Sequence, residues 1–252
     1  MSQPAALTQR PRPDLRAGII ETLLVFEGGP VELDPHLARL RTSAGTLYGQ
    51  EPPPLRELIR GRAREAGLGR MRVTLAPRDG GLDPEIAIAE FPPQLVLPLE
   101  ESSSELRALP VDRGYGEHKW ADRALLGEAE TAAGNGFVPL LVDLEETVLE
   151  ASRANVFLVR EGKLVTPPLD GRILPGIVRS AVFELAAGFG AEVEERTFGV
   201  EEVDAAEEVF LTGSLRGVEP VGGIDGRPLN AVGPLTRELA AGLRERWFGA
   251  WL

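Results

Sequence analysis

One of the two lysines in this chain lies in a setting that suits covalent chemistry. Lys119 stands between His118 and Trp120 in the turn-rich segment GYGEHKWADRALL, just before a predicted helix. An amine beside an aromatic ring and outside any regular run of charged residues can attack a carbonyl carbon and become bonded to it. The competing interpretation is a surface lysine whose aliphatic stem lies on the indole ring. The other lysine, Lys163, follows a predicted tight turn, and we expect it to lie in water.

A carboxylate at the end of an apolar segment is a second candidate. Glu150 lies in ETVLEASRANVF and is followed by a loop of small residues and by Asn155. One interpretation is a solvated strand end. The other is a buried acid that pairs with a cationic ring nitrogen and is kept ionised by that charge.

Three further features could bind an anion. The segment LPGIVR, residues 174–179, offers the backbone amides of Ile177 and Val178 at the positive end of a predicted helix. Ser214 follows a predicted strand and adds a hydroxyl group and free amides. Arg39 in HLARL adds a cation. Each feature can also be interpreted as binding no ligand, since many helix starts bind nothing and most helix arginines are solvated.

Composition excludes several classes of protein. The 252 residues carry a formal net charge of −12, which disfavours binding to nucleic acid or an anionic membrane. The chain contains no cysteine and only two histidines, so disulfides, thiolate nucleophiles and a three-histidine metal site are excluded. No GxSxG motif and no apolar run of about 20 residues occurs. The first residues lack a secretion-signal pattern, and we expect a cytoplasmic protein without a metal.

The elements that must position these residues are mixed strands and helices. A hairpin is predicted around residues 27–30, and the next helix is predicted to use Asp34 as its N-cap and Pro35 as its first residue. Apolar spacing predicts helices over 36–48, 55–67, 124–133, 174–190 and 234–248. Strands are predicted at 70–76, 84–90, 106–111, 191–198 and 207–214 and within 138–152 and 154–167. The strands and helices do not alternate strictly, which predicts an α/β fold with mixed sheets.

Proline and serine mark one boundary in the chain. The stretch FPPQLVLPLEESSS combines three prolines, an acidic pair and a serine run. We therefore predict an N-terminal α/β domain over residues 1–92, a linker over 93–102, and a C-terminal α/β domain over 103–252 that carries Lys119.

The candidates together are the parts that a pyridoxal phosphate enzyme needs. Their order, HLARL, Lys119, LEASRANVF, LPGIVR and EEVFLTGSLRG, resembles the class IV aminotransferase family, fold type IV of the pyridoxal phosphate enzymes, over residues 19–229. The resemblance implies two α/β domains with the cofactor in the interdomain cleft, and a homodimer.

The resemblance also assigns roles to individual residues. Lys119 would carry the cofactor, pyridoxal 5'-phosphate, and act as the catalytic base. Glu150 would hold the protonated pyridine nitrogen, and Leu174 would pack against one face of the ring. The phosphate would be held by Arg39, the amides of Ile177 and Val178, and the Ser214 hydroxyl.

Within the family, the motifs are most like those of aminodeoxychorismate lyases. These show an arginine four residues after the lysine, which Arg123 matches, and SLRG or SLMG where this chain has Ser214 to Gly217. Branched-chain aminotransferases carry a tyrosine five residues after the lysine, where this chain has Ala124. Asp122 stands where several relatives have asparagine.

The resemblance therefore implies conversion of 4-amino-4-deoxychorismate to 4-aminobenzoate and pyruvate for folate synthesis. A functional association with an aminodeoxychorismate synthase would follow from that role. The alternatives are a branched-chain or D-amino-acid aminotransferase on the same scaffold, and a homologue without catalysis. Intact Lys119 and Glu150 argue against the last.

Overall fold

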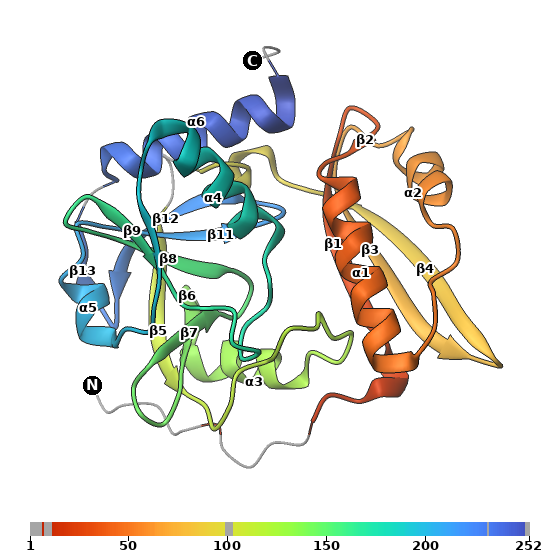
Figure 1. Cartoon of the computed structure of the whole chain (residues 1–252), viewed down its shortest axis with the longest axis horizontal. Helices are drawn as coiled ribbons and strands as arrows, with labels where there is room; N and C mark the ends of the chain where they lie inside the picture. Colours follow the sequence, from red (N-terminus) through yellow and green to blue (C-terminus); the bar gives the residue numbers. More distant parts are fainter. Residues whose placement is uncertain (1–6, 8–11, 99–102, 231, 250–252) are drawn as a thin grey trace. The chain divides into compact units, whose positions relative to one another are not determined.

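Two compact units make up the chain in the computed structural model, which describes residue 7 and residues 12–98, 103–230 and 232–249 (Figure 1). The smaller unit comprises residues 12–96 and 118–123, and the larger unit holds the rest of the described chain. Each unit combines a sheet with helices, so the expected mixed α/β class with two domains is confirmed.

The smaller unit is built on a four-stranded antiparallel sheet in the order β2-β1-β3-β4. Side chains of β3 alternate between the core and the opposite face: Met71, Val73 and Leu75 are fully buried, whereas Arg70 and Arg72 are exposed. Residues of α1 and α2 share the core with these strands, so the helices cover one face of the sheet. The elements are η1 Leu15–Ala17, β1 Ile19–Phe26, β2 Gly29–Pro30, α1 Leu33–Tyr48, α2 Arg56–Ala63, β3 Leu68–Arg78, β4 Gly81–Glu90 and η2 Pro93–Leu95.

The start of α1 differs from the prediction. Asp34 was expected as the N-cap, but the helix begins at Leu33, and Glu32 occupies the cap position in the left-handed region, where its side chain does not cap the helix. Asp34 therefore lies in the first turn, where its charge suits the helix dipole. Its carboxylate forms an ion pair with Arg56 of α2, an interaction between residues that the local sequence pattern does not reveal.

The larger unit contains a mixed sheet whose central path is β10-β9-β8-β11-β12-β5-β6-β7, with β13 paired to β12. Its elements are β5 Ser104–Pro110, α3 Ala124–Ala133, β6 Phe137–Val142, β7 Val148–Ala151, β8 Asn155–Arg160, β9 Lys163–Thr166, α4 Ile177–Phe189, β10 Val193–Glu195, α5 Val200–Asp204, β11 Glu208–Gly213, β12 Gly217–Ile224, β13 Arg227–Pro228 and α6 Pro234–Phe248.

This sheet curls because β7, at one end of the strand order, lies next to β8, which is inside that order. A two-residue turn joins β7 to β8, with a bridge between Ala151 and Ala154. Alternate side chains of the strands, such as Leu158 of β8 and Leu211 of β11, fill the inner core. On the outer side, α4 and α6 pack together over β11 and β12, and α3 packs on β5 and β6 (Figure 1). Phe157 and Phe210 stack beneath α4, with their ring centroids 5.1 Å apart.

The division of the chain differs from the predicted domain boundaries, because Leu7 belongs to the larger unit and residues 118–123 belong to the smaller one. Residues 99–102 of the predicted linker lie outside the described residues, and the described linker residues include a short 3-10 helix at Pro93–Leu95. Lys119 was assigned to the C-terminal domain, but residues 118–123 group with the smaller unit. The reason is backbone pairing, since the amide of Ile20 in β1 donates to the Lys119 carbonyl at 2.8 Å.

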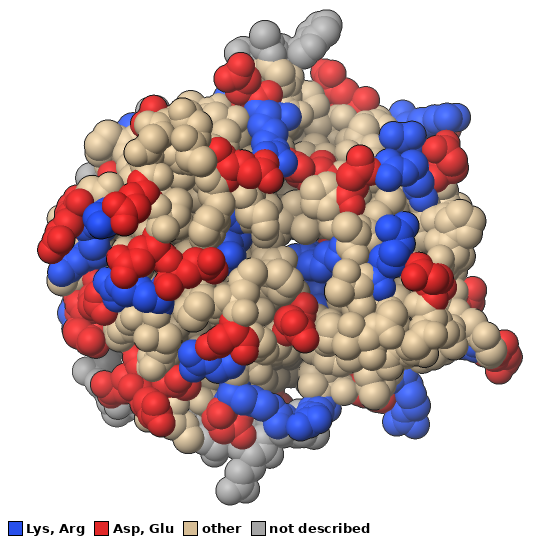
Figure 2. Space-filling view, viewed as in Figure 1, with Lys and Arg blue, Asp and Glu red and all other residues tan. Residues whose placement is uncertain are grey.

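Two surface properties bear on possible partners. No helix within the described ranges is long and apolar enough to cross a membrane. On the face seen in Figure 2, basic and acidic side chains are interspersed. That face therefore presents no continuous basic area of the kind that contacts a nucleic-acid backbone.

Candidate active site

Lys119 is held by its backbone against the first strand of the smaller unit. Its carbonyl accepts from Ile20, and the amide of Ala121 donates to the Gly18 carbonyl at 3.0 Å. Trp120 packs against the core of this unit and meets the His118 ring edge-on. These contacts fix the backbone on both sides of the lysine, as a residue that must present an amine at one position requires.

Lys163 is a much poorer nucleophile. Its side chain is 44% exposed and forms an ion pair with Glu192 at 2.9 Å. The hydrogen bond to Glu192 raises the pKa of Lys163 above its ordinary value, so the amine is protonated near neutral pH. The expectation that this lysine lies at a solvated turn is confirmed, which leaves Lys119 as the candidate amine.

Arg39 belongs to a buried polar cluster in the smaller unit and is not a solvated helix arginine. Its guanidinium donates to both carboxylate oxygens of Glu21, through Nε at 2.8 Å and Nη2 at 2.7 Å. Nδ1 of His36 lies 2.7 Å from the same carboxylate. The Arg39 side chain is only 9% exposed, and that of Glu21 only 3%. Ile20 forms a backbone hydrogen bond with Lys119, and the Glu21 carboxylate binds Arg39. Two neighbouring residues of β1 therefore hold the two candidate site residues of this unit, Lys119 and Arg39.

Sequence reasoning did not single out Glu21 or His36. Burial opposes ionisation of Glu21, but the charges of Arg39 and His36 and their hydrogen bonds outweigh it and lower its pKa from 4.5 to about 2. A glutamate inside the apolar strand IIETLLVF was the available signal, because such a residue needs a cationic partner. Its partners lie on α1 and were not identifiable before the helix was placed on the sheet.

In the larger unit, Glu150 is buried and joined to the segment that precedes α4. Its Oε2 accepts from the Leu174 amide at 3.2 Å and from Nδ2 of Asn155 at 3.4 Å. Asn155 Nδ2 also donates to the Leu174 carbonyl at 2.9 Å. The interpretation of Glu150 as a solvated strand end is therefore wrong, since the residue is 6% exposed. A buried carboxylate held in this way could retain a proton on a nearby cationic nitrogen.

The start of α4 forms the candidate phosphate site. The helix begins at Ile177 after Gly176, which provides no side-chain cap, and its first backbone bond runs from Ser180 to Gly176. The amides of Ile177 and Val178 therefore precede the first intrahelical donor. A Cβ on Gly176 would overlap Oδ1 of Asn155, so a side chain at this position would force Asn155 to move.

A buried hydroxyl near this helix start supports an oxygen-rich ligand there. Thr212 Oγ1 is buried and has no hydrogen-bond partner in the described part of the chain. Thr212 pairs across the sheet with Asn155, which contacts the residues before α4. Ser214 follows two residues later in the turn between β11 and β12. An unpaired buried hydroxyl is costly, and a bound phosphate would satisfy it, so these residues fit the expected group.

Two arginines on the smaller unit were also missed, and Arg123, noted from the sequence only for its spacing from Lys119, lies near them. Arg70 and Arg72 lie on the face of β3 opposite the core. Partial desolvation of the Arg72 guanidinium lowers its pKa below the ordinary value, and the neighbouring charges of Arg123 and Arg70 lower that pKa further. None of the three forms a salt bridge with another described residue, so this face favours an anion. The nearby Asp122 carboxylate accepts from the Asp14 amide at 3.0 Å.

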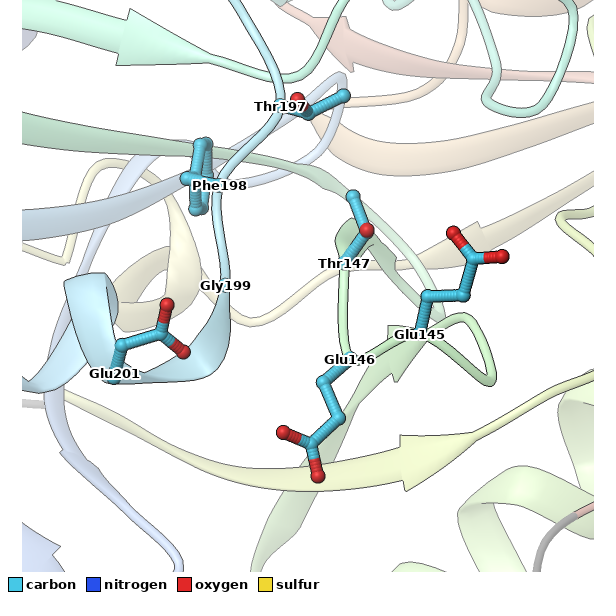
Figure 3. Close-up of a pocket in the computed structure, with 7 residues that line it drawn as sticks. All are labelled: Glu145, Glu146, Thr147, Thr197, Phe198, Gly199 and Glu201. Atoms are coloured by element: carbon cyan, nitrogen blue, oxygen red, sulfur yellow. The ribbon is translucent and has the colours of Figure 1, made fainter.

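A separate pocket of about 260 Å³ contains none of the predicted residues (Figure 3). It lies in the larger unit, between the turn before β7 and the segment before α5. It is lined by Glu145, Glu146, Thr147, Thr197, Phe198, Gly199 and Glu201. No set of three or more candidate ligands for a metal ion is found among the described residues. The pocket is therefore assigned no role in the chemistry.

A comparison with known protein families identifies the family to which the chain belongs. A sequence model described as "Amino-transferase class IV" matches residues 18–224. A Thermotoga maritima protein named "Probable branched-chain-amino-acid aminotransferase" is 31% identical over 93% of this chain and 90% of its own length. The chain belongs to the class IV aminotransferase family.

Solved structures agree with this assignment. The 4-amino-4-deoxychorismate lyase from Pseudomonas aeruginosa is 28% identical and covers 90% of each chain, with a TM-score of 0.76. A hypothetical aminotransferase from Mycobacterium tuberculosis in its PLP-bound form has a TM-score of 0.81 at 24% identity, over 92% of this chain and 90% of that one. The second similarity supports the fold alone. The family confirms pyridoxal phosphate as the cofactor.

The first prediction concerns Gly176. We expect Gly176→Ala to cost about 1–3 kcal/mol of unfolding free energy, because the methyl group must displace Asn155 from Leu174 and Glu150. Gly188→Ala is the matched control, since nothing lies within 4 Å of its Cβ, and it should stabilise α4 by about 0.5–1 kcal/mol. Urea unfolding measures both. Equal effects of the two changes would contradict the close approach.

The second prediction concerns pH and Glu21. Because its pKa falls from 4.5 to about 2 on folding, Glu21 stabilises the protein fully above about pH 4.5. That contribution, on the order of 3 kcal/mol, is lost as the pH falls from there towards 2. We expect Glu21→Gln to make unfolding free energy less dependent on pH in this window. Glu57→Gln, at an exposed position in α2, should keep the wild-type slope. Identical slopes for all three proteins would refute the assignment.

Proposed function

We propose that the chain is a pyridoxal phosphate-dependent aminotransferase that moves an amino group between an amino acid and a 2-oxo acid. The observation that carries this proposal is the similarity to the Thermotoga protein over nearly the whole of both chains. The sequence motifs favoured the lyase, whereas the comparisons support the aminotransferase alternative better. A branched-chain amino acid is the first substrate to test, and a D-amino acid is the second.

Each candidate residue has a separate role in the proposed reaction. When bound, pyridoxal phosphate supplies a protonated pyridine ring that withdraws electrons from the amine-bearing carbon of the substrate. Glu150 retains the proton on the pyridine nitrogen through its negative charge. The Lys119 amine takes the proton from the amine-bearing carbon and returns it to an acceptor atom. Arg39, Ser214 and the α4 amides orient the phosphate end.

The lyase remains the second candidate because of specific residues. Arg123 lies four residues after Lys119, and Ala124 replaces the tyrosine expected of a branched-chain aminotransferase. The similarity to the Pseudomonas lyase structure also favours it. This reaction releases pyruvate and 4-aminobenzoate without a second amino acceptor. For either activity we expect a homodimer, and for the lyase an association with the synthase that makes its substrate.

A pair of assays tests both candidates on the holoenzyme. One supplies leucine or D-alanine with 2-oxoglutarate and measures glutamate. The other supplies 4-amino-4-deoxychorismate and measures pyruvate. Glutamate formation in the first assay, with no pyruvate formed from 4-amino-4-deoxychorismate in the second, supports the aminotransferase. Pyruvate formation in the second assay, with no glutamate in the first, replaces the aminotransferase with the lyase. If holoenzyme with its visible absorbance intact catalyses neither reaction, both proposals are wrong.

The third prediction concerns Lys119. We expect Lys119→Ala to remove the visible absorbance of the bound cofactor and nearly all turnover, because no other described lysine is a suitable amine. Circular dichroism should show an intact fold. Lys163→Ala is the matched control and should keep both properties, since that side chain is exposed and paired with Glu192. Loss of the chromophore in the control instead would overturn the assignment.

The fourth prediction concerns Glu150. Glu150→Gln keeps an oxygen that can accept from Leu174 but removes the charge opposite the pyridine nitrogen. We expect the cofactor to stay bound while kcat falls about tenfold to a hundredfold or more. Glu208→Gln is the control, because this buried glutamate accepts from Leu235 and Thr236 at the start of α6. The control should lower stability but not kcat. Unchanged kcat in Glu150→Gln would exclude the proposed role.

The fifth prediction ranks the phosphate ligands by cofactor affinity. Arg39→Ala should weaken affinity most, because a full positive charge is lost and buried Glu21 loses the guanidinium that it binds. Ser214→Ala should cost about 1–2 kcal/mol, roughly tenfold. Val178→Ala should lower thermal stability but barely change affinity, since the backbone amide is retained and the side chain is buried. Equilibrium titration with cofactor measures all three, and a larger effect for Val178 than for Ser214 would contradict the ranking.

A further inference from the structure

A buried carboxylate in the larger unit holds two arginines at once. Glu219 is 3% exposed, and its Oε1 accepts from Ser104 Oγ at 2.6 Å, Arg153 Nη2 at 3.0 Å and Arg216 Nη1 at 2.7 Å. Its Oε2 accepts from Arg153 Nη1 at 2.7 Å. The lone pairs of this carboxylate are therefore almost fully used.

The two arginines lie on neighbouring turns at the end of the sheet that carries the candidate site. Arg153 belongs to the two-residue turn between β7 and β8, three residues after Glu150. Arg216 belongs to the turn between β11 and β12, two residues after Ser214. The turns are adjacent, because Asn155 pairs with Thr212 and the Arg153 carbonyl lies 3.5 Å from the ideal Cβ position of Gly213.

The cluster has an excess of positive charge. Two guanidinium groups face one carboxylate, which leaves a net charge of about one positive unit and several N–H donors unused. The side chains of Arg153 and Arg216 are 30% and 26% exposed, so these donors can reach a ligand. Burial and the charge of Arg153 lower the pKa of Arg216 below its ordinary value despite Glu219. A second arginine is more than a buried glutamate needs for neutralisation, and it adds repulsion.

We propose that Arg153 and Arg216 bind a carboxylate group of a dicarboxylic substrate. Glu219 and Ser104 hold the two planar guanidinium groups in place, and each retains donors that suit a carboxylate. The inference rests on the proposed function, because 2-oxoglutarate, the acceptor in that reaction, has two carboxylates. The substrate of the alternative lyase reaction also has two, so the inference holds for either activity.

The cofactor phosphate is the other anion that could bind near Ser214. It already has a set of donors in the α4 amides, Ser214 and Arg39, whereas no other group is assigned to the substrate carboxylate in this unit. A carboxylate also matches the planar fork of an arginine in a two-bond arrangement. The experiment below therefore measures affinity for each anion separately.

The test uses glutarate as the probe and calorimetry of the holoenzyme as the readout. Arg216→Met is the main variant, since Glu219 keeps Arg153 and Ser104 as partners and the fold is retained. Glutarate affinity should fall about tenfold to a hundredfold, and Arg216→Lys should restore part of it. The uncharged glutaramide should bind wild-type protein far more weakly than glutarate. Arg196→Met, which removes an ion pair with Glu202, is the control and should bind glutarate as wild type does.

Three results would overturn the proposal. The first is glutarate affinity within twofold of wild type in Arg216→Met. The second is an equal loss in Arg196→Met. The third is weaker cofactor binding in Arg216→Met with glutarate affinity retained, which would assign the pair to the phosphate. Calorimetry reports binding and not turnover. If both activity assays fail but Arg216→Met still loses glutarate binding, only the proposed function is refuted, and the carboxylate site stands.

Discussion

A carboxylate that leaves water must be surrounded by donors, because an unpaired buried charge costs several kcal/mol. Glu21, Glu150 and Glu219 are each no more than 6% exposed, and each meets this requirement differently. Glu21 binds a guanidinium and an imidazole, Glu150 a backbone amide and an asparagine, and Glu219 two guanidinium groups and a serine. These partners are the candidate functional groups or adjoin them, so the pairing constraint also positions the chemistry.

The sheets supply the rigid supports for these pairs. In the smaller unit, β1 holds the backbone beside Lys119 and the carboxylate that binds Arg39. In the larger unit, the curl of the sheet makes the β7–β8 and β11–β12 turns neighbours. Short turns on packed strands keep side chains in fixed positions, whereas long loops would lose more conformational entropy on binding.

The two candidate activities share Lys119 and Glu150 and differ in what happens after the proton leaves the amine-bearing carbon. Substrate choice therefore depends on groups away from these two residues. Each unit carries a group of arginines, with Arg70, Arg72 and Arg123 in the smaller unit and the Glu219-bound pair in the larger one. In the proposal above, the Glu219-bound pair binds one carboxylate of a substrate that has two.

The family, the mixed α/β class and the order of the elements could be predicted from the amino-acid sequence, because motif order and apolar periodicity are properties of the chain itself. The sequence also distinguished Lys119 from Lys163 through a tight turn. It did not reveal that Asp34 pairs with Arg56, that Lys119 joins the smaller unit, or that Glu21 binds Arg39 and His36. These pairs are visible only in the folded protein, because the partners are separated along the chain and meet when strands and helices pack. The Arg153–Glu219–Arg216 cluster joins residues 66 positions apart in the same way.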